Sequence, residues 1–178
     1  GSFFGQEKMH RLFVSALLIL LTGCAGQQQS ITPVLPEPDR QYLCKARIMF
    51  SDATREFSTR ETIGNSLYML NLGEPLTARI PKSLWMDSAA LNSGRPVPIV
   101  TIGFAHTTGI RETIDGKEMF QVGLQFQIFK PTGQSISDTV TGQSASTNGQ
   151  RASEEALALA LLRLESMLES AGICRRVE

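Results

Sequence analysis

The sequence predicts an α+β fold in which an antiparallel sheet of three to four strands is packed on one face by two helices, forming two layers. Two observations carry this prediction. Residues 120–128 alternate between apolar and polar side chains with a period of two, which is typical of a strand with one buried face. Residues 153–171 place apolar side chains at helical spacing, so we expect this helix to cover the buried face.

The predicted sheet is a meander in the middle of the chain. The alternation of Val, Ile and Phe with smaller side chains predicts a first strand at residues 100–104. An Asp-Gly pair at residues 115–116 turns the chain into the strand at 120–128, whose wet face is expected to be formed by Gln121, Gly123, Gln125 and Gln127. After a Pro-Thr-Gly turn, residues 135–146 are rich in Ser and Thr, and we expect them to form an edge strand.

Two helices are predicted. Ile63, Leu67 and Leu70 have helical spacing within residues 62–72, and Gly73 and Pro75 would end that helix. The final helix, residues 153–171, has Ser153 as its expected N-cap and Gly172 followed by Ile173 as a Schellman-type stop. Its apolar stripe consists of Leu157, Ala160, Leu161, Leu164, Leu168 and Ala171.

The other segments give weaker patterns. Residues 44–50 are consistent with a strand, residues 51–60 with a polar surface loop, and residues 87–98 with a connection. Residues 76–86 are left unassigned, because Pro81 is incompatible with a regular helix through the middle of this segment.

The N-terminal region carries a targeting signal. Met9, His10 and Arg11 form a small basic start, residues 12–21 are apolar, and Leu21, Thr22 and Gly23 lead into Cys24. A membrane-spanning helix needs roughly 20 apolar residues, so this shorter run indicates a signal segment. A buried core helix is the alternative, but the polar tract at residues 26–30 follows the run directly.

This pattern resembles the signal peptide and lipobox of Gram-negative bacterial lipoproteins. The resemblance implies that Cys24 is lipidated and becomes the first residue of the mature chain. In such lipoproteins an Asp after the lipidated cysteine is the usual signal for retention in the inner membrane, and here Ala25 follows Cys24. The resemblance therefore also implies that the protein is anchored in the inner leaflet of the outer membrane, with its domain facing the periplasm.

The expected organisation of the chain follows from this signal. Residues 1–8 are upstream or added residues, and residues 9–23 are the lipoprotein signal peptide. Residues 24–43 are the lipidated cysteine and a tether rich in Gln and Pro, expected to be extended and solvated. Residues 44–178 form a single periplasmic α+β domain.

Amino-acid composition and cysteine content limit the classes of function that the protein can have. Seventeen basic and seventeen acidic residues leave no net charge, which gives bulk electrostatics no preference for nucleic acid or anionic lipid. In an oxidising periplasm, Cys44 and Cys174 are expected to form a disulfide, the alternative being two unpaired thiols. Neither a metal site nor a cofactor is expected, apart from the covalent lipid on Cys24.

The sequence shows no motif for catalysis. Beyond the signal peptide His106 is the one histidine, and its possible partners Glu112 and Asp115 are more typical of a solvated turn. We therefore expect no enzymatic activity. Leu84, Trp85 and Met86 form an apolar cluster that is a possible partner surface if it is exposed and a cap on the core if it is buried.

These observations lead to two functional hypotheses. The first is a non-enzymatic accessory or assembly subunit of a cell-envelope complex, anchored in the outer membrane through Cys24 and bound to other envelope proteins. The alternative is a periplasmic binding module for a lipid, glycan or other envelope ligand, held between the sheet and a helix.

Overall fold

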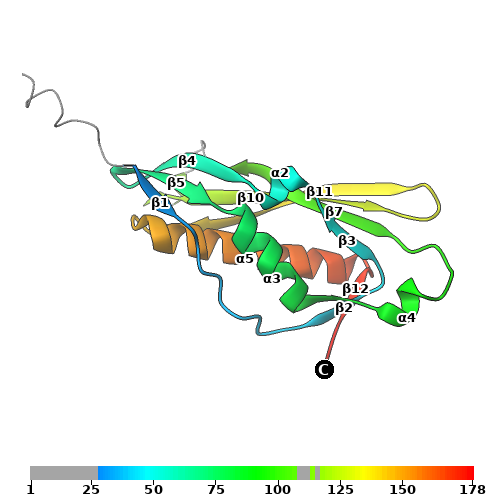
Figure 1. The fold of residues 1–178 in the computed structure, drawn as a ribbon. Coiled ribbons are helices and arrows are strands. Elements are labelled where there is room, and N and C mark those ends of the chain that lie inside the picture. The colour runs from blue at the N-terminus through cyan, green and yellow to red at the C-terminus, as the bar shows by residue number, and fades with distance from the viewer. Residues whose placement is uncertain (1–27, 108–112, 115–116) are drawn as a thin grey trace, which may run out of the picture.

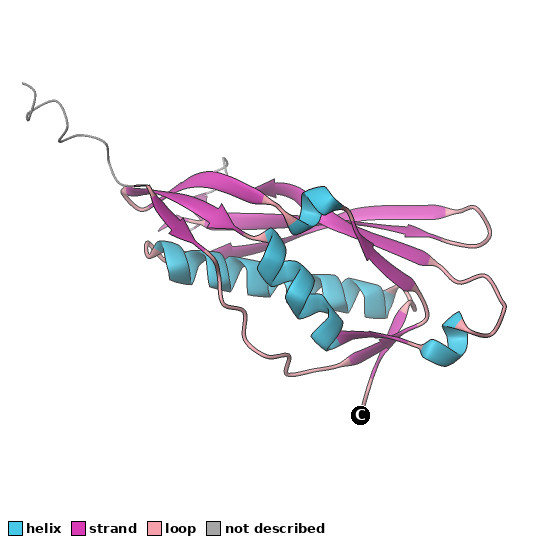
Figure 2. Cartoon of the chain, in the orientation of Figure 1, coloured by secondary structure: helices cyan, strands magenta, loops and turns pink. Residues whose placement is uncertain are grey.

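The structure, a computed structural model, describes residues 28–107, 113–114 and 117–178. Figures 1 and 2 show a twisted sheet with a long helix across one face and a second, shorter helix beside the first. The signal peptide, Cys24 and the possible histidine partners Glu112 and Asp115 lie outside the described residues. The mixed helix and strand content confirms the predicted α+β class.

The elements in chain order are β1 (Gln29–Ile31), β2 (Tyr42–Cys44), β3 (Arg47–Phe50), α2 (Asp52–Arg55), β4 (Ser58–Ile63), β5 (Ser66–Asn71), α3 (Gly73–Ser83), β6 (Leu84–Met86), α4 (Ser88–Leu91), β7 (Ile99–Thr107), β8 (Thr113–Ile114), β9 (Lys117–Glu118), β10 (Phe120–Phe129), β11 (Ser135–Ser144), α5 (Gly149–Ser170) and β12 (Cys174–Arg176).

The main sheet has the strand order β11-β10-β7-β3. Strands β7, β10 and β11 form the predicted antiparallel meander, and β11 lies at the edge as expected. The sheet is mixed and not purely antiparallel, because β3 pairs in parallel with β7. A parallel pair needs a long crossover, and here the chain from β4 to α4 provides it.

The core lies between the main sheet and α5. Val122, Leu124 and Ile128 on β10 are completely buried, and their face packs against the apolar stripe of α5. Gly142 on β11 permits the close approach of the helix, because a Cβ at this position would lie 1.9 Å from the carbonyl oxygen of Ala156. The predicted packing of the last helix on the dry face is therefore confirmed, except that Ala171 at the end of the stripe is exposed.

The opposite face of the sheet is less open than the glutamine pattern predicted. Gln125 is exposed, but Gln121 is only 8% exposed. Thr54 of α2 lies near this face, since a Cβ at Gly103, the register partner of Gln125, would lie 3.3 Å from the Thr54 hydroxyl. The rings of Phe57 and Phe104 stack with centroids 4.2 Å apart, and Phe104 is paired with Leu124 of the buried face. The alternation identified the two faces of β10 correctly but could not show that Gln121 is buried.

Of the predictions for the two ends of α5, one is wrong and one is confirmed. The helix begins earlier than predicted, because Asn148 and not Ser153 is the N-cap and its side chain accepts a hydrogen bond from the Arg151 amide. The expected Schellman stop is confirmed. Gly172 has a φ of 72°, and the amide of Ile173 donates to the carbonyl of Leu168 over 3.0 Å.

The helix predicted at residues 62–72 is wrong, because this segment forms the hairpin β4–β5. Gly64 and Asn65 make the turn, and in β5 Tyr68 and Leu70 are buried while Leu67 is 49% exposed. The spacing of Ile63, Leu67 and Leu70 fitted a helix by coincidence. β1 pairs in parallel with the other edge of β5, a long-range contact that no local pattern reveals.

The second helix is α3, in the segment left unassigned at the sequence level. Pro75 lies in its first turn, where a backbone donor has no helical partner. Pro81 lies in its last turn, so the missing donor deprives only one carbonyl, that of Thr77, of its helical hydrogen bond. A proline near each end is thus compatible with an eleven-residue helix.

The N-terminal segment is not a solvated tether over the residues that the structure describes. β1 pairs with β5, and β2 pairs with both β6 and β12. We call residues 32–41, which connect β1 to β2, the strap. The strap is pinned to α5 by a hydrogen bond from the Val34 amide to Glu154 and to α3 by one from Arg79 to the Pro36 carbonyl.

Other boundaries also differ from the prediction. The strand expected at residues 44–50 is divided into β2 and β3, which belong to different sheets. The predicted surface loop at 51–60 contains α2 and the start of β4, and the connection at 87–98 contains α4. Each short helix begins at a side-chain cap, Ser51 for α2 and Asp87 for α4.

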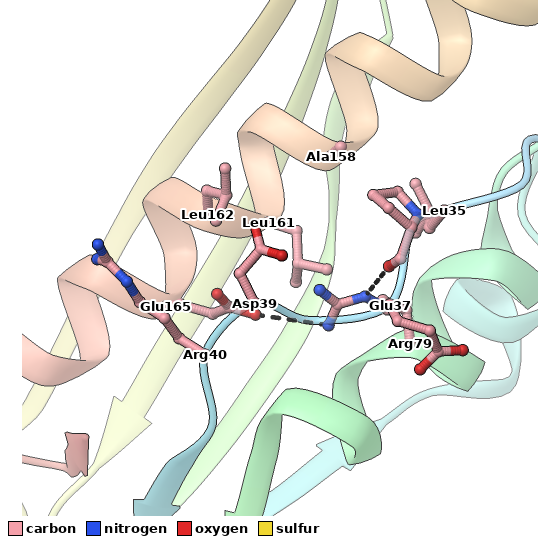
Figure 3. A pocket seen from close by; sticks show the side chains of 10 residues that line it. Leu35, Glu37, Asp39, Arg40, Arg79, Ala158, Leu161, Leu162 and Glu165 are labelled. Atoms are coloured by element: carbon pink, nitrogen blue, oxygen red, sulfur yellow. Dashed lines mark hydrogen bonds and ion pairs between the residues drawn. The ribbon is translucent and has the colours of Figure 1, made fainter. Parts of the chain in front are cut away.

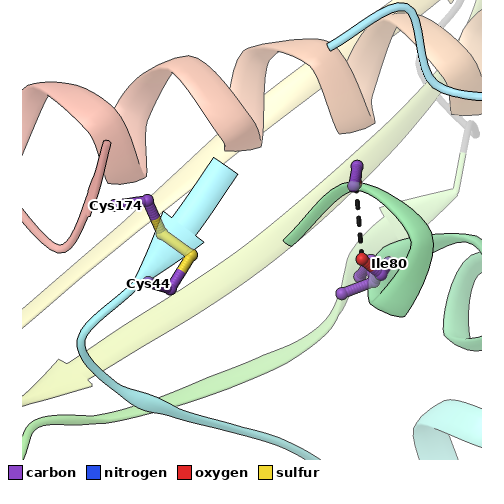
Figure 4. The surroundings of a disulfide bond; sticks show 4 residues. Cys44, Ile80 and Cys174 are labelled. Carbon is purple, nitrogen blue, oxygen red and sulfur yellow. Dashed lines mark hydrogen bonds between the residues drawn. A yellow bond between two sulfur atoms is a disulfide. The ribbon is translucent and has the colours of Figure 1, made fainter. Parts of the chain in front are cut away.

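The predicted disulfide between Cys44 and Cys174 is present and connects residues 130 positions apart (Figure 4). It lies in the small sheet β12-β2-β6, where the two cysteines are directly opposite each other on antiparallel strands. The bond therefore joins the last strand of the chain to the start of the domain.

We expect the substitution Gly142→Ala to reduce the free energy of unfolding by about 3 kcal/mol or more, because α5 must move away from β11 to admit the Cβ. Gly133→Ala is the control. It has open space around the Cβ but a φ of 87°, so it should cost only about 1–2 kcal/mol. Urea unfolding of both variants would check this, and equal losses would contradict the close packing at Gly142.

Replacing Cys44 and Cys174 together by Ala should lower stability by up to about 5 kcal/mol, because the disulfide closes a loop of 130 residues in the unfolded chain. The measurement is the difference in urea midpoint between the oxidised wild type and the double variant. The reduced wild type should unfold like the variant, and an unchanged midpoint on reduction would show that the bond does not constrain the chain.

Candidate functional site

The three apolar residues predicted as a possible partner surface form β6, and the structure separates them. Leu84 is 3% exposed and belongs to the core, whereas Trp85 is 41% and Met86 is 49% exposed. Of the two alternatives, exposure therefore holds for Trp85 and Met86 and burial holds for Leu84.

Trp85 belongs to a short row across the outer face of the small sheet. Its register partner on β2 is Leu43, and Leu43 is in turn opposite Arg175 on β12. Arg175 is exposed and Leu43 is half-buried. Trp and Arg are among the residue types most enriched in energetic hot spots at protein interfaces. The disulfide joins β2 and β12, the strands that carry Leu43 and Arg175, and β6 with Trp85 is paired with β2.

His106 lies on the surface near the end of β7. Its ring occupies the space above Gly123, since a Cβ at that glycine would lie 2.3 Å from the imidazole Cε1. In the part of the chain that the structure describes, no three His, Cys, Asp or Glu side chains are grouped so that they could hold a metal ion. None of the helices in that part combines the length and apolar character needed to cross a membrane.

The structure shows a second candidate site that the sequence did not suggest. A cavity of about 340 Å³ lies between the strap, α3 and α5 (Figure 3). Its aliphatic wall is formed by Leu35, Ala158, Leu161 and Leu162. The remaining lining residues are Pro36, Glu37, Asp39, Arg40, Arg79 and Glu165.

Arg79 and Glu165 form a buried ion pair in this cavity. The Arg79 Nη1 and Glu165 Oε1 atoms are 3.8 Å apart, and the two side chains are 10% and 2% exposed. Arg79 Nε donates to the carbonyl of Pro36 over 2.7 Å. Within the described part of the chain, Arg79 Nη1 and Glu165 Oε1 themselves have no hydrogen-bond partner, which is costly for buried charged groups.

The buried position changes the acidity of Glu165. Loss of solvent raises the pKa of its carboxyl group above the ordinary value, and this outweighs the hydrogen bond from Ser83 and the charge of Arg79, which lower it. Across the cavity, Asp39 and Arg40 of the strap are both exposed. Burial thus favours the protonated form of the Glu165 carboxyl.

A surface ion pair fastens the strap beside the cavity. Lys82 Nζ of α3 lies 2.6 Å from Glu37 Oε1. The hydrogen bond and the charge of Lys82 lower the pKa of the exposed Glu37. Together with the bond from Arg79 to Pro36, this contact fixes the strap over α3 and so defines one wall of the cavity.

One signal for this site was present in the sequence. Glu165 directly follows Leu164 and lies four residues after Leu161, within the apolar stripe of the final helix, where a glutamate is not expected. Its partner Arg79 is in the segment that the sequence left unassigned. The pairing depends on how α3 packs beside α5, so the sequence could have indicated a buried acid but not its partner.

Comparisons with known proteins gave the following. No family model matches the chain, and no curated protein sequence matches it. The fold is similar to the crystal structure of protein XCC0632 from Xanthomonas campestris, described as family DUF330, with 13% identity over 82% of this chain and 92% of that chain and a TM-score of 0.41. It is also similar to lipoprotein GNA1162 from Neisseria meningitidis, with 10% identity over 81% of this chain and 98% of that chain and a TM-score of 0.28. Neither TM-score is high enough to carry an inference about function, so we infer the function from the residues of this chain.

The raised pKa of Glu165 predicts a specific pH dependence of stability. Because the folded state favours the protonated carboxyl, the wild type should lose stability relative to Glu165→Gln as the pH rises from about 4 through the raised pKa. Urea unfolding of both proteins at a series of pH values between about 4 and 8 would measure the difference in their free energies of unfolding. The other carboxyl groups are the same in both proteins, so their contributions cancel in this difference. A constant difference, or one that favours the wild type at higher pH, would contradict the assignment.

Proposed function

We propose that this protein is a non-enzymatic lipoprotein of the bacterial cell envelope, anchored through lipid on Cys24 in the inner leaflet of the outer membrane, and that it acts in the periplasm as an accessory or assembly subunit of an envelope complex. The observation that carries this proposal is the position of β1. Its first residue, Gln29, is only five positions after Cys24. Five residues of extended chain reach at most about 18 Å.

This short connection would hold the folded domain close to the membrane. A solvated tether of twenty residues would let the domain move freely, whereas the strap is packed on α3 and α5. A domain fixed in this way presents one end to the lipid and the other to the periplasm. Such an arrangement suits a subunit that contacts a partner held at a defined distance from the same membrane.

The proposed contact surface lies at the end of the domain away from the anchor. The start of α5 lies near β5 and β1, because Gly149 packs against the ring of Tyr68. The end of α5 contacts β12, the strand paired with β2. A helix of 22 residues is about 33 Å long, so the row of Trp85, Leu43 and Arg175 is separated from β1 by the length of α5 (Figure 1).

We expect wild-type protein, expressed in its native host and extracted from envelopes in mild detergent, to retain a stoichiometric protein partner. Trp85→Ala should release this partner, because truncating a central aromatic residue of an interface typically costs about 2 kcal/mol or more. The matched control is Phe129→Ala, which removes another aromatic side chain of similar exposure, 43%, from β10. Co-purification measured by quantitative mass spectrometry reads out both variants.

The anchor is tested by Cys24→Ala in the same preparation. The variant should leave the membrane fraction and lose most of its partner, because the anchor concentrates both proteins at one surface. If wild type and Cys24→Ala fractionate alike as soluble protein, lipid anchoring is excluded. If no partner is retained by the wild type, or if Phe129→Ala releases it as readily as Trp85→Ala, the proposed subunit role or its contact surface is wrong.

A second candidate function is a periplasmic binding module for an envelope ligand. The cavity lined by Arg79 and Glu165 favours this candidate, because its volume lies in the range of small-ligand sites and it combines aliphatic walls with a few buried polar groups. The cavity lies between the strap and two helices, and not between the sheet and a helix as the sequence led us to expect.

A further inference from the structure

The cavity between the strap, α3 and α5 has unused hydrogen-bonding capacity. Arg79 Nη1 is a donor and Glu165 Oε1 is an acceptor, both are buried, and neither has a hydrogen-bond partner among the residues that the structure describes. Of the other polar groups that line the cavity, Arg79 Nε donates to the carbonyl of Pro36 and Glu37 pairs with Lys82, while Asp39 and Arg40 are exposed to solvent. A group that enters the cavity would therefore find one donor and one acceptor 3.8 Å apart.

This geometry matches the backbone of an extended peptide. In an extended chain the N–H and C=O of one residue point to the same side, which is how paired residues of an antiparallel sheet exchange two hydrogen bonds. The C=O would accept from Arg79 Nη1, and the N–H would donate to Glu165 Oε1. Both buried groups would then be satisfied by a single neutral residue, with no further charge brought into the cavity.

The walls indicate the side chain of that residue. Leu35, Leu161 and Leu162 are aliphatic, and the described residues that line the cavity include no aromatic side chain on which a sugar ring could stack. A lipid tail is disfavoured, because its methyl end would bury the ion pair without any hydrogen bond. Leu162 is 52% exposed at the rim, so an apolar side chain that covers it would also remove apolar surface from water.

We propose that this cavity binds an aliphatic residue of an extended polypeptide segment, with the backbone of that residue hydrogen-bonded to Arg79 and Glu165 and its side chain packed against Leu35, Leu161 and Leu162. The inference rests on the second candidate function and names its ligand class. It depends neither on lipidation of Cys24 nor on the surface around Trp85.

The test is a titration of the full chain in detergent, with leucine methyl groups labelled for NMR, using N-acetyl-leucine N-methylamide as the probe. This probe carries one leucine side chain with a complete N–H and C=O on either side. We expect saturable shifts of the methyl signals of Leu35, Leu161 and Leu162. The dissociation constant should be of millimolar order, as befits a ligand of about a dozen heavy atoms.

Two variants and one control locate the binding. Ala158 is half-buried in the cavity wall, and Ala158→Leu should fill the cavity and weaken binding by roughly tenfold or more. Leu162→Ser removes the apolar rim with little effect on the core and should also weaken binding, which keeps the test valid if Ala158→Leu folds poorly. Met167→Ser is the matched control, since Met167 is 37% exposed on the same helix and does not line the cavity.

Each outcome decides the matter. Saturable shifts that weaken in Ala158→Leu or Leu162→Ser and persist in Met167→Ser support the site. An absence of saturable shifts, or shifts equal in all variants, would overturn the proposed peptide site. Tighter binding of N-acetylglucosamine or octanoate at the same methyl groups would replace the peptide by a glycan or a lipid. The proposed role as a lipid-anchored subunit is tested separately by co-purification. Either that proposal or the peptide site can therefore be disproved without affecting the other.

Discussion

The structure depends first on the packing of one helix face on one sheet face. The apolar stripe of α5 covers β10 and β11 so closely that a Cβ at Gly142 would collide with the helix backbone. Because α5 runs from β5 at its start to β12 at its end, it also sets the positions of the elements around it. Tyr68 packs at its start, the strap and α3 lie along its side, and β12 packs at its end.

The side of α5 away from the sheet is less regular, and the cavity lies there. If this side of α5 carried only apolar side chains, they could pack against the strap and α3 without a polar group between them. Glu165 instead places a carboxyl group beside Leu161 and Leu164. Arg79 compensates its charge without completing its hydrogen bonds, and the raised pKa of Glu165 follows from this incomplete compensation. Replacing such a pair by apolar side chains is often neutral or stabilising, so stability alone does not explain it.

The packed strap joins this chemistry to the proposed location of the protein. It follows β1, starts eight positions after Cys24 in the sequence, passes over α3 beside the cavity and leads into β2, where Cys44 is bonded to Cys174. One continuous segment therefore connects the proposed lipid anchor, the cavity wall and the small sheet that carries Trp85. Hydrogen bonds to both neighbouring helices and one ion pair to α3 restrict the strap, which its sequence alone would leave extended and solvated.

The sequence by itself determined the features that depend on neighbouring residues: the alternation of β10, the apolar stripe and Schellman stop of α5, the edge position of β11 and the α+β class. The disulfide was also predicted, because only two cysteines remained for an oxidising compartment. Tertiary structure decided the features that depend on contacts between distant segments. It paired β5 with both β4 and β1 where a helix was predicted at residues 62–72. It also formed α3 with a proline near each end and folded the strap against two helices. The cavity belongs to this second group, because Arg79 and Glu165 are 86 positions apart and meet only where α3 packs beside α5.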